Sequence, residues 1–285
     1  MVEIVSEREP LRATLHEIAL QSPDVAKLAR FYGDALGYSF SEDLTGYLGV
    51  ARDRRLRLCP GPQKTLAYAA YALADRSDLT ALTQRLTAAK VPFENHAPTG
   101  MSDAVRFRDP DGNAFVFGLA DGGEKQQYSE LADRPARLQH IVFASTNVTR
   151  MLQFFTDIIG FTLSDRVLDD QGDLKTVFVR CSHEHHSLAI FDANECRLDH
   201  HCYEAAEWNL IRDWADSFAR QRIALKWGPG RHGPGDNLFL FIHDPDGNWV
   251  EISAELETVK PDRPVGDWPH EEYTLNSWGM GILRS

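Results

Sequence analysis

The feature that most constrains the fold of this chain is an internal repeat. The segment from Leu15, LHEIALQSPDVAKLARFYGDALGYSF, aligns without a gap onto the segment from Leu138, LQHIVFASTNVTRMLQFFTDIIGFTL. Each copy begins with a short apolar run, passes through polar turn residues into apolar positions spaced three and four apart, and ends at a glycine before an aromatic residue. This order predicts a strand, a turn and a helix, with Gly37 and Gly160 as the helix stops.

The two copies also end alike, in VRFRDPDGNAFVFGLA and LFIHDPDGNWVEISAE. Asp-Pro-Asp-Gly-Asn between apolar runs predicts a tight turn joining two strands. Further strands and a second helix are expected between these ends, over 77–90 and 207–221. We therefore predict an α+β fold of two tandem βαβββ modules, the second forming a half-barrel around a metal site. The expected limits are residues 1–122, a linker at 123–136, a catalytic module at 137–256 and a tail at 257–285.

Composition excludes several classes of partner. The formal charge of -12 argues against a nucleic-acid or anionic-membrane surface, because both partners are polyanions. No apolar run approaches the ~20 residues that span a bilayer, and MVEIVSEREP does not resemble a secretory signal. The four cysteines form neither a C-x-x-C pair nor a dense framework. Reduced thiols and a cytoplasmic location are therefore expected.

Histidines are concentrated in the second module, which indicates where the chemistry lies. Eight of the eleven fall between His140 and His243, and Glu251 follows the second DPDGN turn. In the gapless alignment His140 matches Glu17, and Glu251 matches Val116. The first module has no imidazole in the run LAYAAY, where the second has HHCYE. We therefore expect a metal site in the second module and a scaffold role for the first.

Paired modules that open with a strand and helix and close on DPDGN resemble the vicinal oxygen chelate superfamily, which includes glyoxalases, bleomycin-resistance proteins and type I extradiol ring-cleaving dioxygenases. His140, the runs HHSLAIF and LDHHCYE, and Glu251 favour the dioxygenase branch. The resemblance implies that His140, His201 and Glu251 hold Fe(II), with Mn(II) as an alternative, and that O2 is the co-substrate. Two imidazoles and one carboxylate on one face of the ion leave adjacent positions open, as in non-haem iron oxygenases.

The same resemblance implies two further catalytic histidines. His186, the second residue of HHSLAIF, would be the acid-base residue, since histidine exchanges protons near neutral pH. His185 should then face the opposite side of its strand, because side chains alternate. His232, within GPGRHG, would lie beside the metal-bound oxygens and donate a hydrogen bond.

Three departures from homoprotocatechuate-type dioxygenases bear on the substrate. The resemblance places Phe241 where a tyrosine is usual, Val142 where an asparagine is usual, and Trp227 where an arginine holds a substrate carboxylate. Each change replaces a polar contact with an apolar one, and a phenyl ring cannot donate a hydrogen bond. We therefore expect a small aromatic substrate without a carboxylate at that end, such as an alkyl- or aryl-substituted catechol or hydroquinone.

Two other functions remain open at this point. A glyoxalase-like isomerase would recruit ligands from both modules, and Glu17 could be one of them. A metal-free protein that binds an aromatic ligand is the other alternative, favoured by the loss of the tyrosine at Phe241. Because extradiol relatives are usually oligomers, we also expect a homo-oligomer.

Overall fold

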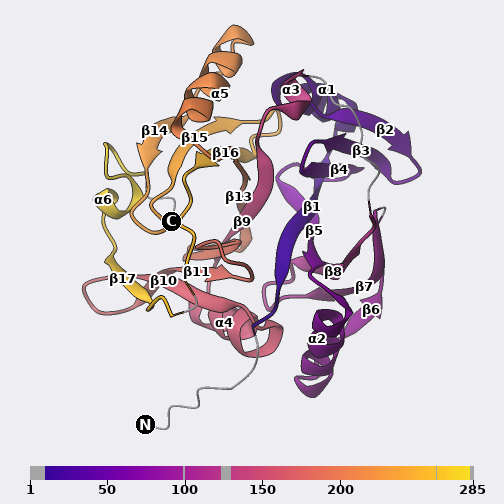
Figure 1. Ribbon diagram of the computed structural model, residues 1–285, viewed down its shortest axis with the longest axis vertical. Helices are drawn as coiled ribbons and strands as arrows, with labels where there is room; N and C mark the ends of the chain where they lie inside the picture. The colour runs from indigo at the N-terminus through magenta and orange to yellow at the C-terminus, as the bar shows by residue number, and fades with distance from the viewer. Residues whose placement is uncertain (1–9, 99, 123–129, 261, 283–285) are drawn as a thin grey trace.

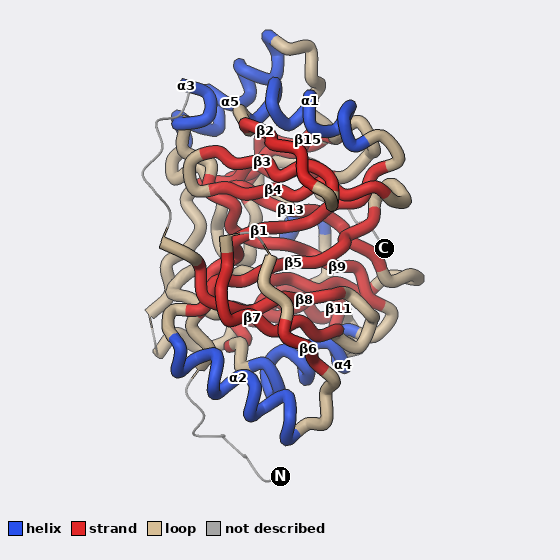
Figure 2. Tube along the Cα trace, turned by 90° about the vertical axis from the view of Figure 1, so that its right-hand side faces the viewer, coloured by secondary structure: helices blue, strands red, loops and turns tan. Residues whose placement is uncertain are grey.

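The computed structural model describes residues 10–98, 100–122, 130–260 and 262–282. Two mixed sheets lie side by side, one from each half of the chain (Figure 1). Figure 2 shows that the strands form the middle of the molecule and that helices gather at its two ends. None of the helices in the described ranges has the length and apolar character needed to cross a bilayer.

The first module forms an eight-stranded sheet in the order β2-β3-β4-β1-β5-β8-β7-β6. Its elements are β1 (Ala13–Ser22), α1 (Val25–Leu36), β2 (Ser39–Asp43), β3 (Gly46–Ala51), β4 (Arg54–Pro60), β5 (Thr65–Leu73), α2 (Arg76–Ala88), β6 (Phe93–Asn95), β7 (Met101–Arg108) and β8 (Ala114–Ala120). Short α3 (Glu130–Asp133) leads into the second module.

The second module repeats this topology and adds one strand. Its order is β14-β15-β16-β13-β9-β12-β11-β10-β17, so that β9 to β16 take the places of β1 to β8. The elements are β9 (Arg137–Ser145), α4 (Val148–Gln153), the π-helix η1 (Phe154–Ile159), β10 (Thr162–Leu168), β11 (Leu174–Arg180), β12 (Leu188–Asp192), β13 (Arg197–Glu204), α5 (Trp208–Arg220), β14 (Trp227–Arg231), β15 (Leu238–His243) and β16 (Trp249–Ala254), followed by β17 (Gly266–Pro269) and α6 (Glu272–Leu275). The prediction of two tandem modules in an α+β fold is confirmed.

Glycine stops the first helix of each module, as predicted. Gly37 has φ 74° and Gly160 has φ 101°, in the left-handed region that favours glycine. Asp109 and Asp244 each close their DPDGN turn by accepting the backbone N–H of the residue four positions on. Part of the predicted linker, 123–129, lies outside the described residues.

The modules share one apolar core. Phe115 of β8 lies edge-on to Phe155 of η1, with ring centroids 5.3 Å apart, and the Tyr71 hydroxyl donates to the Ser187 carbonyl at 2.9 Å. Arg54 is fully buried and donates to carbonyls on α1 and around α3, including those of Leu36 and Ala136. Burial of this apolar and aromatic surface fixes the two sheets against each other.

The tail packs against the second module. Its strand β17 pairs in parallel with β10, from Asp165 opposite Gly266 to Leu168 opposite Pro269. Figure 1 shows the tail, in yellow, along the side of the second module that faces away from the first. The segment beyond the repeat is therefore a structural part of the second sheet.

Candidate metal centre and substrate cavity

Three neighbouring strands of the second sheet build the candidate centre. Cys202 of β13 lies opposite His140 of β9 on one side and Glu251 of β16 on the other. Residues paired in this way place their side chains on the same face of a sheet, and residues two apart in a strand share that face. His200 therefore faces the same cavity as His140 and Glu251.

The two imidazoles converge on one carboxylate oxygen. The Nε2 atom of His140 lies 3.2 Å from Oε2 of Glu251, and Nε2 of His200 lies 3.1 Å from the same oxygen. All three side chains are buried, and all three line one cavity. The donors form a compact set of two nitrogens and a carboxylate at the base of that cavity.

A preceding residue orients each imidazole. Gln139 places its Oε1 2.6 Å from Nδ1 of His140, and Asp199 places its Oδ2 2.6 Å from Nδ1 of His200. Because an amide oxygen and a carboxylate only accept, each Nδ1 carries a proton and donates. The Nε2 lone pairs of the neutral rings then point at the carboxylate of Glu251, which is unfavourable unless a cation lies between them. The donor set therefore fits a divalent metal, with partners at Nδ1 of the kind that metal-binding histidines have.

The electrostatics of the site agree with this arrangement. Burial raises the pKa of Glu251, but its contacts with the imidazoles of His140, His200 and His232 outweigh the effect of burial and hold the pKa well below its ordinary value. Burial lowers the pKa of His140. Burial also lowers the pKa of His200, but the contacts with Asp199 and Glu251 outweigh this effect and raise the pKa above its ordinary value. The carboxylate is thus kept ionised, which is the form that binds a metal.

The prediction that His201 faces the site is wrong. His201 points to the other side of β13, where its Nε2 lies 3.2 Å from the hydroxyl of Tyr32 in the first module. The same hydroxyl donates to Asp244 at 3.1 Å. A register shift between Leu198 and His200 sets which member of the histidine pair faces inward. His201 therefore belongs to the contact between the modules.

The structure places His186 in the cavity and His185 behind it. The ring of His186 lies 4.5 Å, centroid to centroid, from that of His140. His185 is fully buried, does not line the cavity, and has its Nδ1 3.0 Å from Nδ1 of His186. The two residues thus lie on opposite sides, as predicted, although they belong to the loop between β11 and β12 and not to a strand.

His232 also reaches the cavity, from the end of β14. Its Nδ1 donates to the carbonyl of Leu275 in α6 at 2.5 Å, and its Nε2 lies 3.7 Å from Oε1 of Glu251. The ring stacks on Phe239, with centroids 4.0 Å apart and planes at 14°. The tail therefore orients a histidine that faces the candidate metal centre.

The three predicted substrate contacts line the same cavity. Phe241 stacks on Trp227, with ring centroids 5.3 Å apart, and its ring is perpendicular to that of His200, with centroids 5.2 Å apart. Val142 also lines the cavity. The indole N–H of Trp227 donates to the carbonyl of Met280 at 2.9 Å, so its polar end is used by the tail. The ring face of Trp227 is thus an apolar wall.

Sequence reasoning missed several residues of the site. The polar residue directly before each inward histidine, in the pairs Gln139-His140 and Asp199-His200, was the available signal. Asn237 also reaches Glu251, from Nδ2 to Oε1 at 3.4 Å. The tail contribution had no signal in the repeat, because the tail lies outside it.

Cys202 is also close enough to be considered as a donor. Its Sγ, a ring nitrogen of His140 and a carboxylate oxygen of Glu251 all lie within 4.8 Å of one another. However, the thiol donates to the Ser253 hydroxyl at 3.1 Å, and burial raises its pKa well above the ordinary value. Because thiolate is the ligand form of cysteine, His200 is the better third donor.

The sequence profile of the Glyoxalase/Bleomycin resistance protein/Dioxygenase superfamily matches residues 14–117 and 137–252. The chain belongs to this superfamily. Metapyrocatechase 2 of Cupriavidus necator is 28% identical over 95% of this chain and 91% of its own length. A manganese-dependent 2,3-dihydroxybiphenyl 1,2-dioxygenase of Geobacillus genomosp. 3 is 24% identical over 91% of both chains.

Solved structures of this superfamily share the fold. A Mn(II)-bound glyoxalase from Novosphingobium aromaticivorans has a TM-score of 0.83 and 27% identity, covering 96% of this chain and 93% of its own. Homoprotocatechuate 2,3-dioxygenase from Arthrobacter globiformis has a TM-score of 0.81 and 25% identity, covering 96% and 90%. The resemblance inferred from the repeat and the histidines is confirmed at the level of family and fold.

Proposed function

We propose that this chain is a metal-dependent extradiol dioxygenase that opens the ring of a substituted catechol or related dihydroxylated aromatic. The proposal is carried by one observation. The Nε2 atoms of His140 and His200 converge on Oε2 of Glu251 beside an apolar cavity, and each Nδ1 is hydrogen-bonded to the residue before it, Gln139 or Asp199. Curated relatives of similar length act on catechol-type and biphenyl-diol substrates, as their names state. We assign His140, His200 and Glu251 as the ligands.

The ligand chemistry suits Fe(II) or Mn(II), and the names of the relatives include both metals. When bound, either ion would allow electrons to pass from a catecholate to O2. His186 would accept a proton from a substrate hydroxyl, since it borders the cavity next to His140. His232 would donate a hydrogen bond from Nε2, which requires a second proton on a ring whose Nδ1 already donates to Leu275.

The walls of the cavity favour an uncharged substituent. Val142, Trp227 and Phe241 are apolar at the three positions singled out in the sequence, and no arginine lines the cavity among the residues that the structure describes. Lys175 lines it but is bound to Asp192 at 3.0 Å, and Asp199 and Glu271 add negative charge. A substrate carboxylate would lose hydration here without gaining a free cation.

A glyoxalase-like activity is the second candidate, favoured by the Mn(II)-bound structural relative. In that alternative Glu17 was the potential ligand from the first module. Glu17 instead accepts from the Tyr68 hydroxyl at 2.5 Å and from Arg55 at 3.3 Å, within its own module, and it does not line the cavity. This placement weighs in favour of the dioxygenase. A metal-free binding role is disfavoured by the convergent donor set.

Anaerobic loading with Fe(II) or Mn(II), followed by oxygen-uptake assays, tests the proposal. We expect uptake with 4-ethylcatechol and at least about tenfold lower kcat/KM with 3,4-dihydroxyphenylacetate, a difference of ~1.4 kcal/mol. Metal binding without oxygen uptake on any catechol would overturn the dioxygenase assignment. Preference for the carboxylate would overturn the substrate assignment alone.

The homo-oligomeric state and the cytoplasmic location stay predictions. Size-exclusion chromatography with light scattering measures the oligomeric state directly.

A further inference from the structure

His186 has one ring nitrogen turned away from the cavity, toward His185. The two Nδ1 atoms lie 3.0 Å apart, a hydrogen-bond distance. Of two imidazole nitrogens in such contact, one must carry the proton and the other must accept it. The protonation of His185 therefore decides which nitrogen of His186 carries hydrogen.

Behind His185 lies a buried carboxylate. Asp165 of β10 is fully buried, and its Oδ2 lies 2.9 Å from Nε2 of His185. Burial raises the pKa of Asp165, but contacts with His185, Arg263 and Trp268 outweigh it and hold the pKa below its ordinary value. The nearest group to His185 Nε2 is thus an ionised acceptor.

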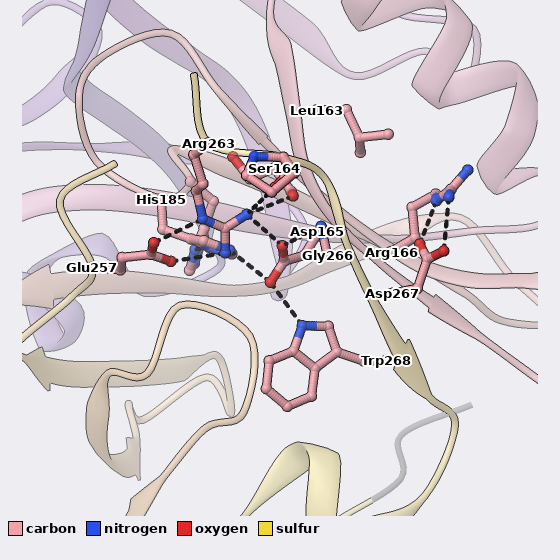
Figure 3. A network of polar contacts seen from close by, with 12 residues as sticks. Leu163, Ser164, Asp165, Arg166, His185, Glu257, Arg263, Gly266, Asp267 and Trp268 are labelled. Carbon is pink, nitrogen blue, oxygen red and sulfur yellow. Dashed lines mark hydrogen bonds and ion pairs between the residues drawn. The ribbon is translucent and has the colours of Figure 1, made fainter. Parts of the chain in front are cut away.

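The tail holds this carboxylate in place (Figure 3). Arg263 donates to Oδ1 at 2.7 Å, the Gly266 backbone donates to Oδ1 at 3.1 Å, and the Trp268 indole donates to Oδ2 at 2.8 Å. Arg263 is itself held by Glu257 at 2.7 and 2.8 Å. Both oxygens of Asp165 therefore accept from tail residues, which fixes the carboxylate against His185.

These contacts set where the ring protons of the two histidines lie. Oδ2 of ionised Asp165 lies 2.9 Å from Nε2 of His185, and although the contact does not have the geometry of a hydrogen bond, the carboxylate favours the His185 hydrogen at Nε2. With its hydrogen at Nε2, His185 presents the Nδ1 lone pair to His186, and Nδ1 of His186 donates to it. The Nε2 of His186 is left with its lone pair, and it makes no hydrogen bond within the described part of the chain, where His186 lines the cavity.

We propose that Asp165 and His185 are positioning residues that hold His186 as the Nδ1–H tautomer, so that its Nε2 faces the cavity as a proton acceptor. The inference rests on the proposed function, in which His186 takes a proton from the substrate. Two residues are thereby added to those that influence the reaction, Asp165 on β10 and His185 on the loop before β12, and both act through His186. Arg263, Gly266 and Trp268 of the tail contribute to the same arrangement, because they hold Asp165 in place.

The test reads the tautomers directly in the metal-free protein. Long-range 1H–15N spectra of histidine-labelled protein at neutral pH distinguish Nδ1–H, Nε2–H and doubly protonated rings, and the His185→Gln and His186→Gln variants assign the signals. We expect His185 as Nε2–H and His186 as Nδ1–H. Finding His186 as Nε2–H, or His185 doubly protonated, would overturn the inference.

Asp165→Asn and Asp267→Asn form a matched pair of variants. Asp267 bonds Arg166 across the same β10–β17 contact, at 2.8 Å, but does not touch His185. We expect Asp165→Asn to shift the His186 tautomer and to lower kcat by about 100-fold, with metal content and KM little changed. Asp267→Asn should leave the tautomer and kcat as they are. An unchanged tautomer in Asp165→Asn would refute the proposal.

Two substitutions at His185 keep the test decisive if Asp165→Asn fails to fold. The amide of His185→Gln can accept from His186 Nδ1, whereas His185→Leu cannot. We expect the glutamine variant to retain the Nδ1–H tautomer and the leucine variant to lose it, and equal spectra would contradict the proposal. The spectra do not depend on enzymatic turnover. A protein that shows these tautomers but takes up no oxygen would therefore refute the proposed function without refuting the proposed tautomers of His185 and His186.

Discussion

The two modules place different side chains on the same row of backbone positions. In the second module the row is His140, Cys202 and Glu251, across β9, β13 and β16. In the first it is Glu17, Ala70 and Val116, across β1, β5 and β8. The same row of backbone positions can therefore exist without a metal site, and its side chains are the first difference between the modules.

The space in front of the row differs as well. Arg57 pairs with Ala19 in the first sheet, where Ala189 pairs with Val142 in the second. Arg57 is buried and lies 3.9 Å from Glu17, so that an ion-paired side chain occupies the place left open beside Ala189. A functional site of this fold needs both a donor set and small residues that keep room for a ligand.

The largest expected effect separates the two members of the histidine pair on β13. We expect His200→Gln to lower iron affinity by more than ~100-fold and to abolish oxygen uptake, because outer partners alone contribute 10- to 100-fold. His201→Gln should keep both, since a glutamine amide can still donate to the Tyr32 hydroxyl, whose hydrogen goes to Asp244. Metal analysis of the purified proteins measures the difference. Full metal content in His200→Gln would return the ligand role to His201.

A second test opens the filled space in the first module. Arg57→Ala should lower the free energy of unfolding by about 3 kcal/mol, because it removes the buried cation beside Glu17, which keeps only Tyr68 and Arg55, and creates a cavity. Arg55→Ala, at a more exposed side chain, should cost less. Urea unfolding measures both, and metal content should not change. A loss below ~1 kcal/mol would show that the arginine is dispensable.

The DPDGN turn of the first module predicts a pH dependence of stability. Burial raises the pKa of Asp109 to about 6. A folded-state pKa above the unfolded value means that the folded protein binds more protons, so this stabilisation is present below the unfolded pKa and is lost as pH rises to about 6. Relative to Asp109→Asn, wild-type stability should fall by up to ~3 kcal/mol between pH 4 and pH 7. Parallel curves in urea unfolding would contradict this.

The smallest expected effect concerns the centre of the row. Cys202→Ala copies Ala70 of the first module and removes the hydrogen bond to Ser253. We expect a loss of about 1 kcal/mol in stability and no loss of metal. Loss of metal from this variant would make Cys202 a ligand and would revise the donor set.

The sequence was sufficient for the fold because the repeat shows its pattern twice. Gly37 and Gly160 occupy positions that need a left-handed backbone, and the DPDGN turns recur at equivalent places. His140 and Glu251 were predicted as ligands from the resemblance to extradiol dioxygenases, and the lack of counterparts in the first module placed the site in the second. These features are local in the sequence, so they can be recognised without the tertiary structure.

The error at His201 and the residues that were missed have a different origin. The choice between His200 and His201 depends on an irregularity in the pairing of β9 and β13, and a one-residue slip reverses the face of every side chain. The link between Asp165 and His185 joins segments that only the sheet and the tail bring together. Such contacts depend on register and on long-range packing.

The tail has a practical consequence for protein engineering. A chain shortened at the end of the second repeat would keep His140, His200 and Glu251 but would lose the Leu275 carbonyl that orients His232 and the Trp268 indole that holds Asp165. Ile282 also lines the cavity. A fusion partner joined directly after Ile282 would therefore begin beside the substrate cavity.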